Sequence, residues 1–295
     1  MGVEHKAGFV SILGNPNVGK STLMNRLVGE RLSIVTHKSQ TTRHRIFGIV
    51  NHADYQIVYS DTPGILRPAY ELQKAMLGAV ESTLQDSDVL LYITDVVEQW
   101  DKHAEVLERV AGSPIPKVVV INKIDLSNQR ELERLVAAWE QRFPGAAVFP
   151  VSALEGFGVE QVQAALIRLL PVAPKYYPED QLTDRPTRFF VTEIVREKIL
   201  QNCAEEVPYS VEVVVREYTE GETMDHIEAV VYVARDSQRG ILIGRGGRMI
   251  RRIGTEARRD LEVFLDKRVF LRLLVQTKER WRDDAGALRN FGYIE

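Results

Sequence analysis

Apolar residues in the first part of the chain follow two alternating patterns. Short runs rich in valine and isoleucine, typical of buried strands, occupy residues 8–14, 55–61, 88–95, 117–123 and 146–152. Apolar residues at helical spacing occupy residues 21–29, 71–85, 103–112, 131–143 and 159–170. Because the two patterns alternate, we expect an α/β domain with a mostly parallel sheet and helices on both faces.

The pattern changes after residue 170. The segment 171–186 holds four prolines and little periodicity, which is typical of an interdomain linker. The spacing beyond it predicts, in order, a helix at 192–204, strands at 209–220 and 227–235, a short helix at 236–242, a longer helix ending near residue 266, a strand at 269–277 and a short terminal helix. In the longer helix, Ile250 and Ile253 share one face and are expected to enter the core. The predicted organisation is a first domain at 1–172, a linker at 173–187 and a second, α+β domain at 188–295.

Length and composition agree with two globular domains. The chain has 295 residues, and domains commonly have ~150 residues each. Its apolar runs are far shorter than the ~20 residues that span a bilayer, and its N-terminus lacks the features of a signal peptide. The single cysteine, Cys203, excludes an internal disulfide, and we interpret it as a core residue. These features predict a cytoplasmic protein.

The stretch 14–21 reads GNPNVGKS and stands between a predicted strand and a predicted helix, as a phosphate-binding loop requires. Its glycines, Gly14 and Gly19, allow backbone N–H groups to point at phosphate oxygens. Lys20 is expected to reach the β- and γ-phosphates, and Ser21 to supply a hydroxyl to Mg²⁺. The predicted nucleotide contacts of this region also include Asn15, Asn17, Val18 and Thr22.

The sequence NKID at 122–125 follows a predicted strand and indicates which base is bound. The Asp125 carboxylate can accept two parallel hydrogen bonds from guanine, a pair of donors that adenine lacks. Asn122 and Lys123 are expected to brace the base and the phosphate loop. In the SALEG segment that follows the next strand, Ser152 and Ala153 complete the expected base pocket, with the Ala153 N–H donating to the guanine oxygen. The predicted ligand is GTP or GDP.

Residues expected to sense the γ-phosphate lie in two further segments. In DTPG at 61–64, Asp61 is expected near Mg²⁺, and the Gly64 N–H can contact the γ-phosphate. In QTTR at 40–43, the hydroxyl of Thr42 is expected to complete the Mg²⁺ sphere, with Thr41 as the alternative. The pattern indicates a switch that hydrolyses GTP.

The residue after DTPG is Ile65, where Ras-like proteins place a glutamine that orients the attacking water. We expect Asn17 to assist catalysis instead by helping to hold K⁺, beside the contributions of Lys20, Thr42 and Gly64. The alternative is that Asn17 only stabilises the loop.

A second glycine cluster occupies residues 243–253. Gly244, Gly246 and Gly247 form a GXXG loop before a helix, the pattern with which KH domains clamp about four nucleotides. The order of elements predicted after the linker is that of the type II KH fold. Although the chain carries a net charge of −3, residues 239–259 hold seven arginines and one acidic residue. The arginines expected to contact RNA are Arg245, Arg248, Arg251 and Arg252; for the last two a solvated helix face is the alternative.

The sequence resembles the Era family of bacterial GTPases over nearly the whole chain. The stretches that carry the resemblance are, in order, GNPNVGKS, SQTTRHRI, DTPG, NKID, SAL, TDRPTRFF, EIVREK, VPYSVEV, IGRGGRMI and WRDDAGALRNFGY. The resemblance implies a P-loop GTPase domain followed by a type II KH domain. It also implies binding near the 3′ end of small-subunit ribosomal RNA, a role in 30S subunit assembly, and peripheral association with the inner membrane. We expect a monomer that uses Mg²⁺. The alternative is a membrane-associated or cell-cycle signalling GTPase with a protein target.

Overall fold

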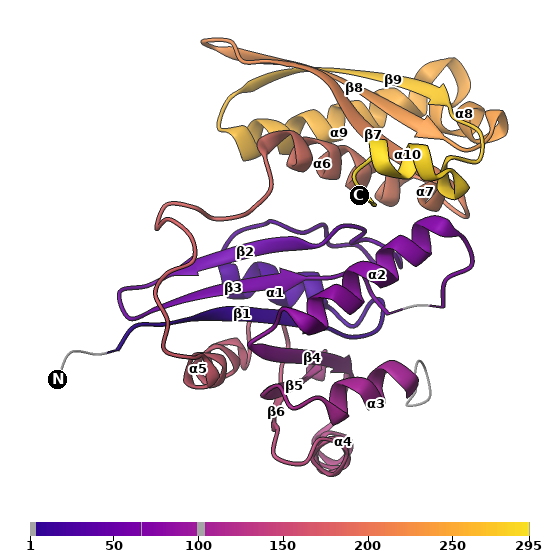
Figure 1. Cartoon of the computed structure of the whole chain (residues 1–295). Coiled ribbons are helices and arrows are strands. Elements are labelled where there is room, and N and C mark those ends of the chain that lie inside the picture. Colours follow the sequence, from indigo (N-terminus) through magenta and orange to yellow (C-terminus); the bar gives the residue numbers. More distant parts are fainter. Residues whose placement is uncertain (1–3, 66, 99–103, 295) are drawn as a thin grey trace. The chain divides into compact units, whose positions relative to one another are not determined.

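A computed structural model describes residues 4–65, 67–98 and 104–294 of the chain. The residues form two compact units (Figure 1). The first comprises Met1–Pro68 and Met76–Asp184, and the second Ala69–Ala75 and Arg185–Glu295.

The first unit is built on a six-stranded sheet in the order β2-β3-β1-β4-β5-β6. Its strands are β1 (Lys6–Leu13), β2 (Ile46–Asn51), β3 (Tyr55–Asp61), β4 (Val89–Asp95), β5 (Lys117–Asn122) and β6 (Ala147–Pro150). All neighbouring strands are parallel except the pair β2 and β3. The mostly parallel sheet is confirmed, whereas β2 was not predicted.

Helices cover both faces of this sheet. They are α1 (Lys20–Val28), α2 (Glu71–Gln85), α3 (Ala104–Gly112), α4 (Gln129–Arg142) and α5 (Val159–Leu169). One core cluster joins α2, α3 and α4 to the central strands through Val80, Val110, Trp139 and Phe143, with Tyr92 from β4 among them. The helix α1 packs against α5 on the other side. The loops that carry GNPNVGKS, DTPG, NKID and SALEG therefore start from strand ends, whereas QTTR lies between α1 and β2.

Residues 173–184, which we call the strap, run along the edge strand β2. The Ile49 N–H donates to the Leu182 carbonyl at 2.8 Å, and the Phe47 N–H donates to Asp184 Oδ1 at 2.9 Å. The buried Gln56 side chain accepts the N–H groups of Tyr176 and Tyr177 at 2.7 and 3.0 Å. The strap thus satisfies backbone groups that an edge strand otherwise exposes, and most of the predicted linker packs on the first unit.

The second unit contains a three-stranded sheet in the order β7-β8-β9. Its elements are α6 (Thr187–Asn202), α7 (Val207–Ser210), β7 (Val211–Thr219), β8 (Met224–Val233), α8 (Asp236–Ile243), α9 (Arg248–Leu265), β9 (Arg268–Thr277) and α10 (Ala285–Asn290). The strands β7 and β8 are antiparallel, and β8 and β9 are parallel. Apart from the short helix α7, the order matches the predicted helix–strand–strand–helix–helix–strand.

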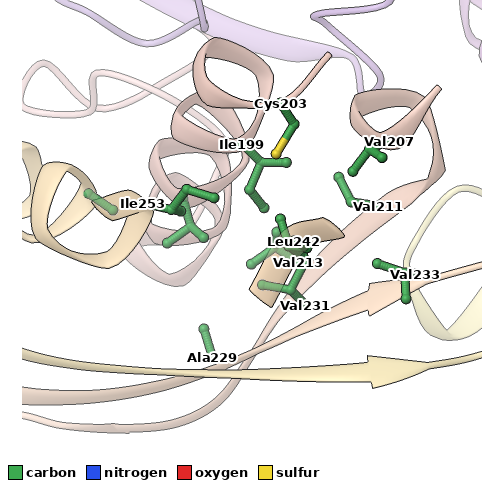
Figure 2. Close-up of a cluster of buried hydrophobic side chains, with 12 residues drawn as sticks. Ile199, Cys203, Val207, Val211, Val213, Ala229, Val231, Val233, Leu242 and Ile253 are labelled. Atoms are coloured by element: carbon green, nitrogen blue, oxygen red, sulfur yellow. The ribbon is translucent and has the colours of Figure 1, made fainter. Parts of the chain in front are cut away.

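The core of the second unit lies between this sheet and the helices α6, α8 and α9 (Figure 2). Cys203 is buried in it, as predicted. On α9 the buried positions are Ile253, Ala257 and Leu261, which repeat every four residues and form one stripe. Ile250 lies on the same side, in the first turn of α9 next to the glycine loop, and is only half-buried, so its predicted entry into the core is confirmed only in part.

Replacing Gln56 by alanine should loosen the strap. The variant loses the acceptor for two backbone N–H groups, and we expect the free energy of unfolding to fall by about 1–3 kcal/mol. Urea denaturation measures this loss, and limited proteolysis at residues 173–184 should become faster. Gln85→Ala, at an exposed position at the end of α2, serves as the control; equal stability of the two variants would contradict the role of Gln56.

Candidate functional site

The predicted phosphate loop connects β1 to α1, at the carboxyl end of a central strand. Gly19 caps α1 with φ of 95°, a left-handed conformation that favours glycine. The Lys20 ammonium is buried and donates to the carbonyls of Gly14 and Asn15 at 3.1 and 2.8 Å. Burial lowers the pKa of Lys20 to about 8, against the opposing charges of Asp61 and Glu98. The loop therefore presents a buried cation at the N-terminus of a helix, which suits phosphate.

The DTPG segment packs directly against this loop. A Cβ on Gly64 would lie 2.8 Å from Pro16 Cα, so only glycine permits this approach. The Ile65 N–H donates to the Gly14 carbonyl at 3.3 Å, and the Ile65 side chain is buried in the core. Ile65 accordingly offers no polar group to the phosphates.

Three oxygen-bearing side chains converge beside the phosphate loop. Ser21 Oγ donates to Asp61 Oδ2 at 2.8 Å and lies 2.9 Å from Thr42 Oγ1, which itself donates to Asp61 Oδ2 at 3.1 Å. The second carboxylate oxygen, Asp61 Oδ1, is buried without a hydrogen-bond partner among the described residues. Burial raises the pKa of Asp61, and Lys20 opposes this rise. Two hydroxyls and a carboxylate are hard oxygen donors, so the set fits Mg²⁺.

Thr41 takes a different position from Thr42. Its hydroxyl donates to the Lys38 carbonyl at 2.6 Å and pairs with the Thr36 hydroxyl at 3.1 Å. Of the two threonines considered for Mg²⁺, Thr42 is the one that the structure brings to Ser21 and Asp61.

Residues of the predicted base pocket join three loops. Asn122 Nδ2 donates to the Val18 carbonyl at 2.8 Å, and Asn122 Oδ1 accepts the Ala153 N–H at 3.0 Å. The Ser152 hydroxyl donates to Asp125 Oδ1 at 2.6 Å. The Ala153 N–H, which we predicted to contact the guanine oxygen, therefore donates to Asn122 in this structure. The other predicted nucleotide residue, Thr22, lies half-buried in the first turn of α1.

Lys123 is held by an acid that the sequence analysis missed. Its ammonium forms an ion pair with Asp95 at 2.5 Å and donates to the Asn17 carbonyl at 2.6 Å. Asp95 is buried at the end of β4, where it also accepts the Val97 N–H. The position of Asp95 at the end of a predicted strand was the available signal.

Two more residues of the site were missed. The Glu98 carboxylate accepts hydrogen bonds from the Asn15 side chain and from Thr94 Oγ1, the latter at 2.6 Å. Arg26, in the last turn of α1, donates from Nε to the Ala153 carbonyl at 3.2 Å and from Nη2 to the Leu154 carbonyl at 2.6 Å. Nothing in the local pattern distinguishes either residue from an ordinary surface charge.

Asn17 is exposed and has φ of 67°, and its side-chain amide donates to the His37 carbonyl at 3.2 Å. It therefore connects the phosphate loop to the segment that carries Thr42. The contact is compatible with both readings of Asn17, as a cation ligand and as a loop stabiliser.

In the second unit, the GXXG loop lies between α8 and α9. Gly244, Gly246 and Gly247 have φ of 71°, 58° and 77°, and a Cβ on Gly244 would lie 2.8 Å from Met249 Cβ. Gly247 is the N-terminal cap of α9, so free N–H groups of the helix face the loop. Arg245 and Arg248 are exposed directly before and after the pair Gly246 and Gly247.

The next two arginines differ from each other. Arg251 folds back onto the loop, where it donates to the Gly246 carbonyl and, at 3.3 Å, to the Gly247 carbonyl. Arg252 instead pairs with Glu256 at 2.9 Å one turn along the helix. Arg251 is thus part of the loop, whereas Arg252 has an acidic partner that a phosphate would have to displace.

Removing the Arg26 guanidinium should free the SALEG segment. If this segment contributes to the base pocket, Arg26→Ala should weaken GDP binding by about 1 kcal/mol, or about fivefold. Titration with a fluorescent GDP analogue measures the change, and Arg130→Ala, on the exposed side of α4, is the control. Unchanged affinity with normal thermal stability would show that the segment needs no support from α1.

Two family models match the chain, one in each unit. Residues 9–123 match the family described as 50S ribosome-binding GTPase. Residues 206–282 match the family described as KH domain. The two matches contain, respectively, the phosphate loop with most of its associated motifs and the GXXG loop with α9.

Two solved structures are similar to nearly the whole chain. One is a crystal structure of Era in complex with MgGDPNP and nucleotides 1506–1542 of 16S ribosomal RNA; it is 35% identical, covers 99% of this chain and 100% of that chain, and has a TM-score of 0.94. The other is a crystal structure of an Aquifex aeolicus Era variant bound to GDP and AlF4⁻; it is 35% identical, covers 98% and 100% of the two chains, and also has a TM-score of 0.94. With this identity over the full length of both relatives, and with a GTPase unit followed by a KH unit, the chain belongs to the Era family of GTPases.

Proposed function

We propose that this protein is a GTP-hydrolysing switch that binds the 3′ region of small-subunit ribosomal RNA and assists assembly of the 30S subunit. The observation that carries the proposal is the presence, in one chain, of the Ser21–Thr42–Asp61 cluster beside a phosphate loop and of an exposed GXXG loop. The Era relative that is similar over its full length was crystallised with both a GTP analogue and 16S ribosomal RNA, which supports both halves of the proposal.

In the proposed reaction, Lys20 and the N-terminus of α1 bind the phosphates, and Asp125 selects guanine. Ser21 and Thr42 would hold Mg²⁺, with Asp61 beside them. Bound there, Mg²⁺ would neutralise charge on the β- and γ-phosphate oxygens. The chain's own residues thus supply positioning and electrostatic stabilisation, the two main sources of catalysis in phosphoryl transfer.

Two segments would respond to the γ-phosphate. Thr42 and Gly64 both lie against the phosphate loop, directly or through Ser21. Loss of the γ-phosphate would remove the contact that holds each segment, so both would relax after hydrolysis. We propose that this change controls how the KH unit presents its RNA-binding loop.

The proposed setting is the cytoplasm, with peripheral association with the inner membrane and a monomeric state. The described part of the chain contains no helix that could cross a membrane. A fractionation experiment with the protein in its GTP-bound and GDP-bound forms tests the membrane part of the proposal.

We further propose that Asn17 helps to hold K⁺ near the phosphates. Replacing Asn17 by glycine removes the side chain and still allows the positive φ of this position. The wild-type protein should hydrolyse GTP faster in KCl than in NaCl. The variant should lose this difference, and its rate in KCl should fall about tenfold or more.

GTP affinity, measured in both salts, separates the two readings of Asn17. Similar rates of GTP hydrolysis by the wild-type protein in KCl and NaCl would contradict the proposed role of K⁺. A variant that binds GTP more weakly but keeps its preference for KCl would identify Asn17 as a loop stabiliser.

A carboxylate in the GXXG loop should repel RNA without disturbing the nucleotide site. We expect Gly246→Asp to weaken binding of a small-subunit rRNA 3′-end fragment by about tenfold or more. Gly292→Asp is a matched control, because both glycines have positive φ and neither has an atom within 4 Å of the added Cβ. Fluorescence anisotropy of the labelled RNA, with GTP analogue, with GDP and without nucleotide, measures the RNA affinity and its dependence on the nucleotide.

Tight binding that favours the GTP analogue and is lost in Gly246→Asp would support the proposed function. RNA affinity that is the same in all nucleotide states and is unchanged by Gly246→Asp would instead favour the second candidate, a signalling GTPase with a protein target.

A further inference from the structure

In the described part of the chain, the helices α6, α8 and α9 cover only one face of the sheet of the second unit. Valines and other apolar residues of β7, β8 and β9 point toward α6, α8 and α9 and form the core. Figure 1 shows both long helices, α6 and α9, on the same side of this sheet. The opposite side, which we call the outer face, carries the alternate residues of each strand.

Part of the outer face is covered by the end of the chain. The Tyr293 hydroxyl donates to Glu212 at 2.6 Å, and the Phe291 and Tyr232 rings lie 5.6 Å apart. The part nearer the start of β9 remains open and displays an aromatic pair. His226 and Phe270 lie opposite each other in register, with ring centroids 5.4 Å apart, and Phe270 is 52% exposed.

Arginines flank this aromatic pair along β9. Arg268 and Arg272 stand two residues before and after Phe270, so all three side chains share the outer face. Arg272 lies 3.1 Å from Glu228, which also pairs with Arg216 at 3.2 Å. The two arginine side chains are 63% and 64% exposed, whereas that of Glu228 is only 15% exposed. One carboxylate balances one of the two arginines, so an accessible positive charge remains.

Acidic residues occur on β7, the strand at the opposite edge of the sheet from β9. Glu217, Glu220 and Glu222 lie on β7 and in the turn that follows it. On the outer face, β9 therefore presents only basic charged residues, Arg268 and Arg272, whereas β7 presents Arg216 together with Glu217. A polyanion would follow β9.

The exposed residues of β9 include more than the charges that protect an edge strand from pairing with another chain. Charged residues alone prevent an edge strand from pairing with another chain, so the arginines have that alternative explanation. An exposed pair of rings does not serve this purpose. Aromatic side chains on a sheet, with arginines beside them, are the features with which proteins bind single-stranded nucleic acid.

We propose that the outer face is a second site for single-stranded RNA, in which a base stacks on Phe270 beside His226 and Arg268 and Arg272 contact the flanking phosphates. The inference rests on the proposed RNA-binding function of this unit. The site is separate from the GXXG loop, because the 18 residues of α9 separate the two by about 27 Å. An RNA that reaches both must be longer than the roughly four nucleotides that a GXXG loop clamps.

Binding of two RNA lengths to the full-length protein tests the proposal. One probe is a single strand of about four nucleotides and the other of about 16 nucleotides, both from the 3′ end of small-subunit rRNA. Phe270→Ala should weaken binding of the longer RNA by about 5- to 150-fold and leave the short RNA unaffected. Phe270→Tyr keeps a ring and should retain most of the affinity.

Two further variants complete the experiment. Val263→Ala removes another exposed apolar side chain, 83% exposed near the end of α9, and should change neither affinity. Arg272→Ala should reduce the salt dependence of binding for the longer RNA by about 0.7 in the log–log slope, the effect of one lost phosphate contact.

The outcomes separate this inference from the function on which it rests. If the wild-type protein binds both RNAs and Phe270→Ala binds the longer one equally well, the outer face does not bind RNA and the proposed function stands. If the wild-type protein binds neither RNA, both proposals fail. Equal losses in Phe270→Ala and Val263→Ala would also overturn the proposal, because the effect would then not come from stacking.

Discussion

The nucleotide site depends on the side-chain amide of Asn122. This one group donates to the Val18 carbonyl of the phosphate loop and accepts the Ala153 N–H of the SALEG segment. It lies so close to Gly19 that a Cβ there would overlap it. Because Asn122 ends a buried central strand, it fixes the distance between the loop that binds phosphate and the loop that binds the base. A ligand that contacts both loops must therefore span a fixed distance.

The sequence predicted most of the fold and the main residues of the site, because both depend on local patterns. Strands of valine and isoleucine and the glycine motifs can be read within about ten residues. The strand β2 was missed because Gly48 interrupts its β-forming residues; a Cβ there would lie 2.6 Å from Val28 of α1. Arg26, Asp95 and Glu98 were missed because their roles come from contacts with residues distant in the sequence.

The two glycine loops share one backbone arrangement but are suited to different ligands. Each precedes a helix whose N-terminal cap is a glycine with positive φ, so the free N–H groups of the helix are oriented to bind an anion. In the first, the buried Lys20 and the Ser21–Thr42–Asp61 cluster make a closed site for a compact, highly charged ligand. In the second, Arg245 and Arg248 are exposed, and the loop is open to a chain that continues in both directions. Burial of the charged groups, rather than the glycines, distinguishes a nucleotide site from a polynucleotide site.

The strap also determines the length of chain between β2 and α6. Its last contact with β2 is made by Asp184, and α6 begins at Thr187. Only Arg185 and Pro186 lie between these points, and two extended residues span at most about 7 Å. A connection of this length has few accessible conformations, so folding it costs less conformational entropy than folding a long flexible linker would.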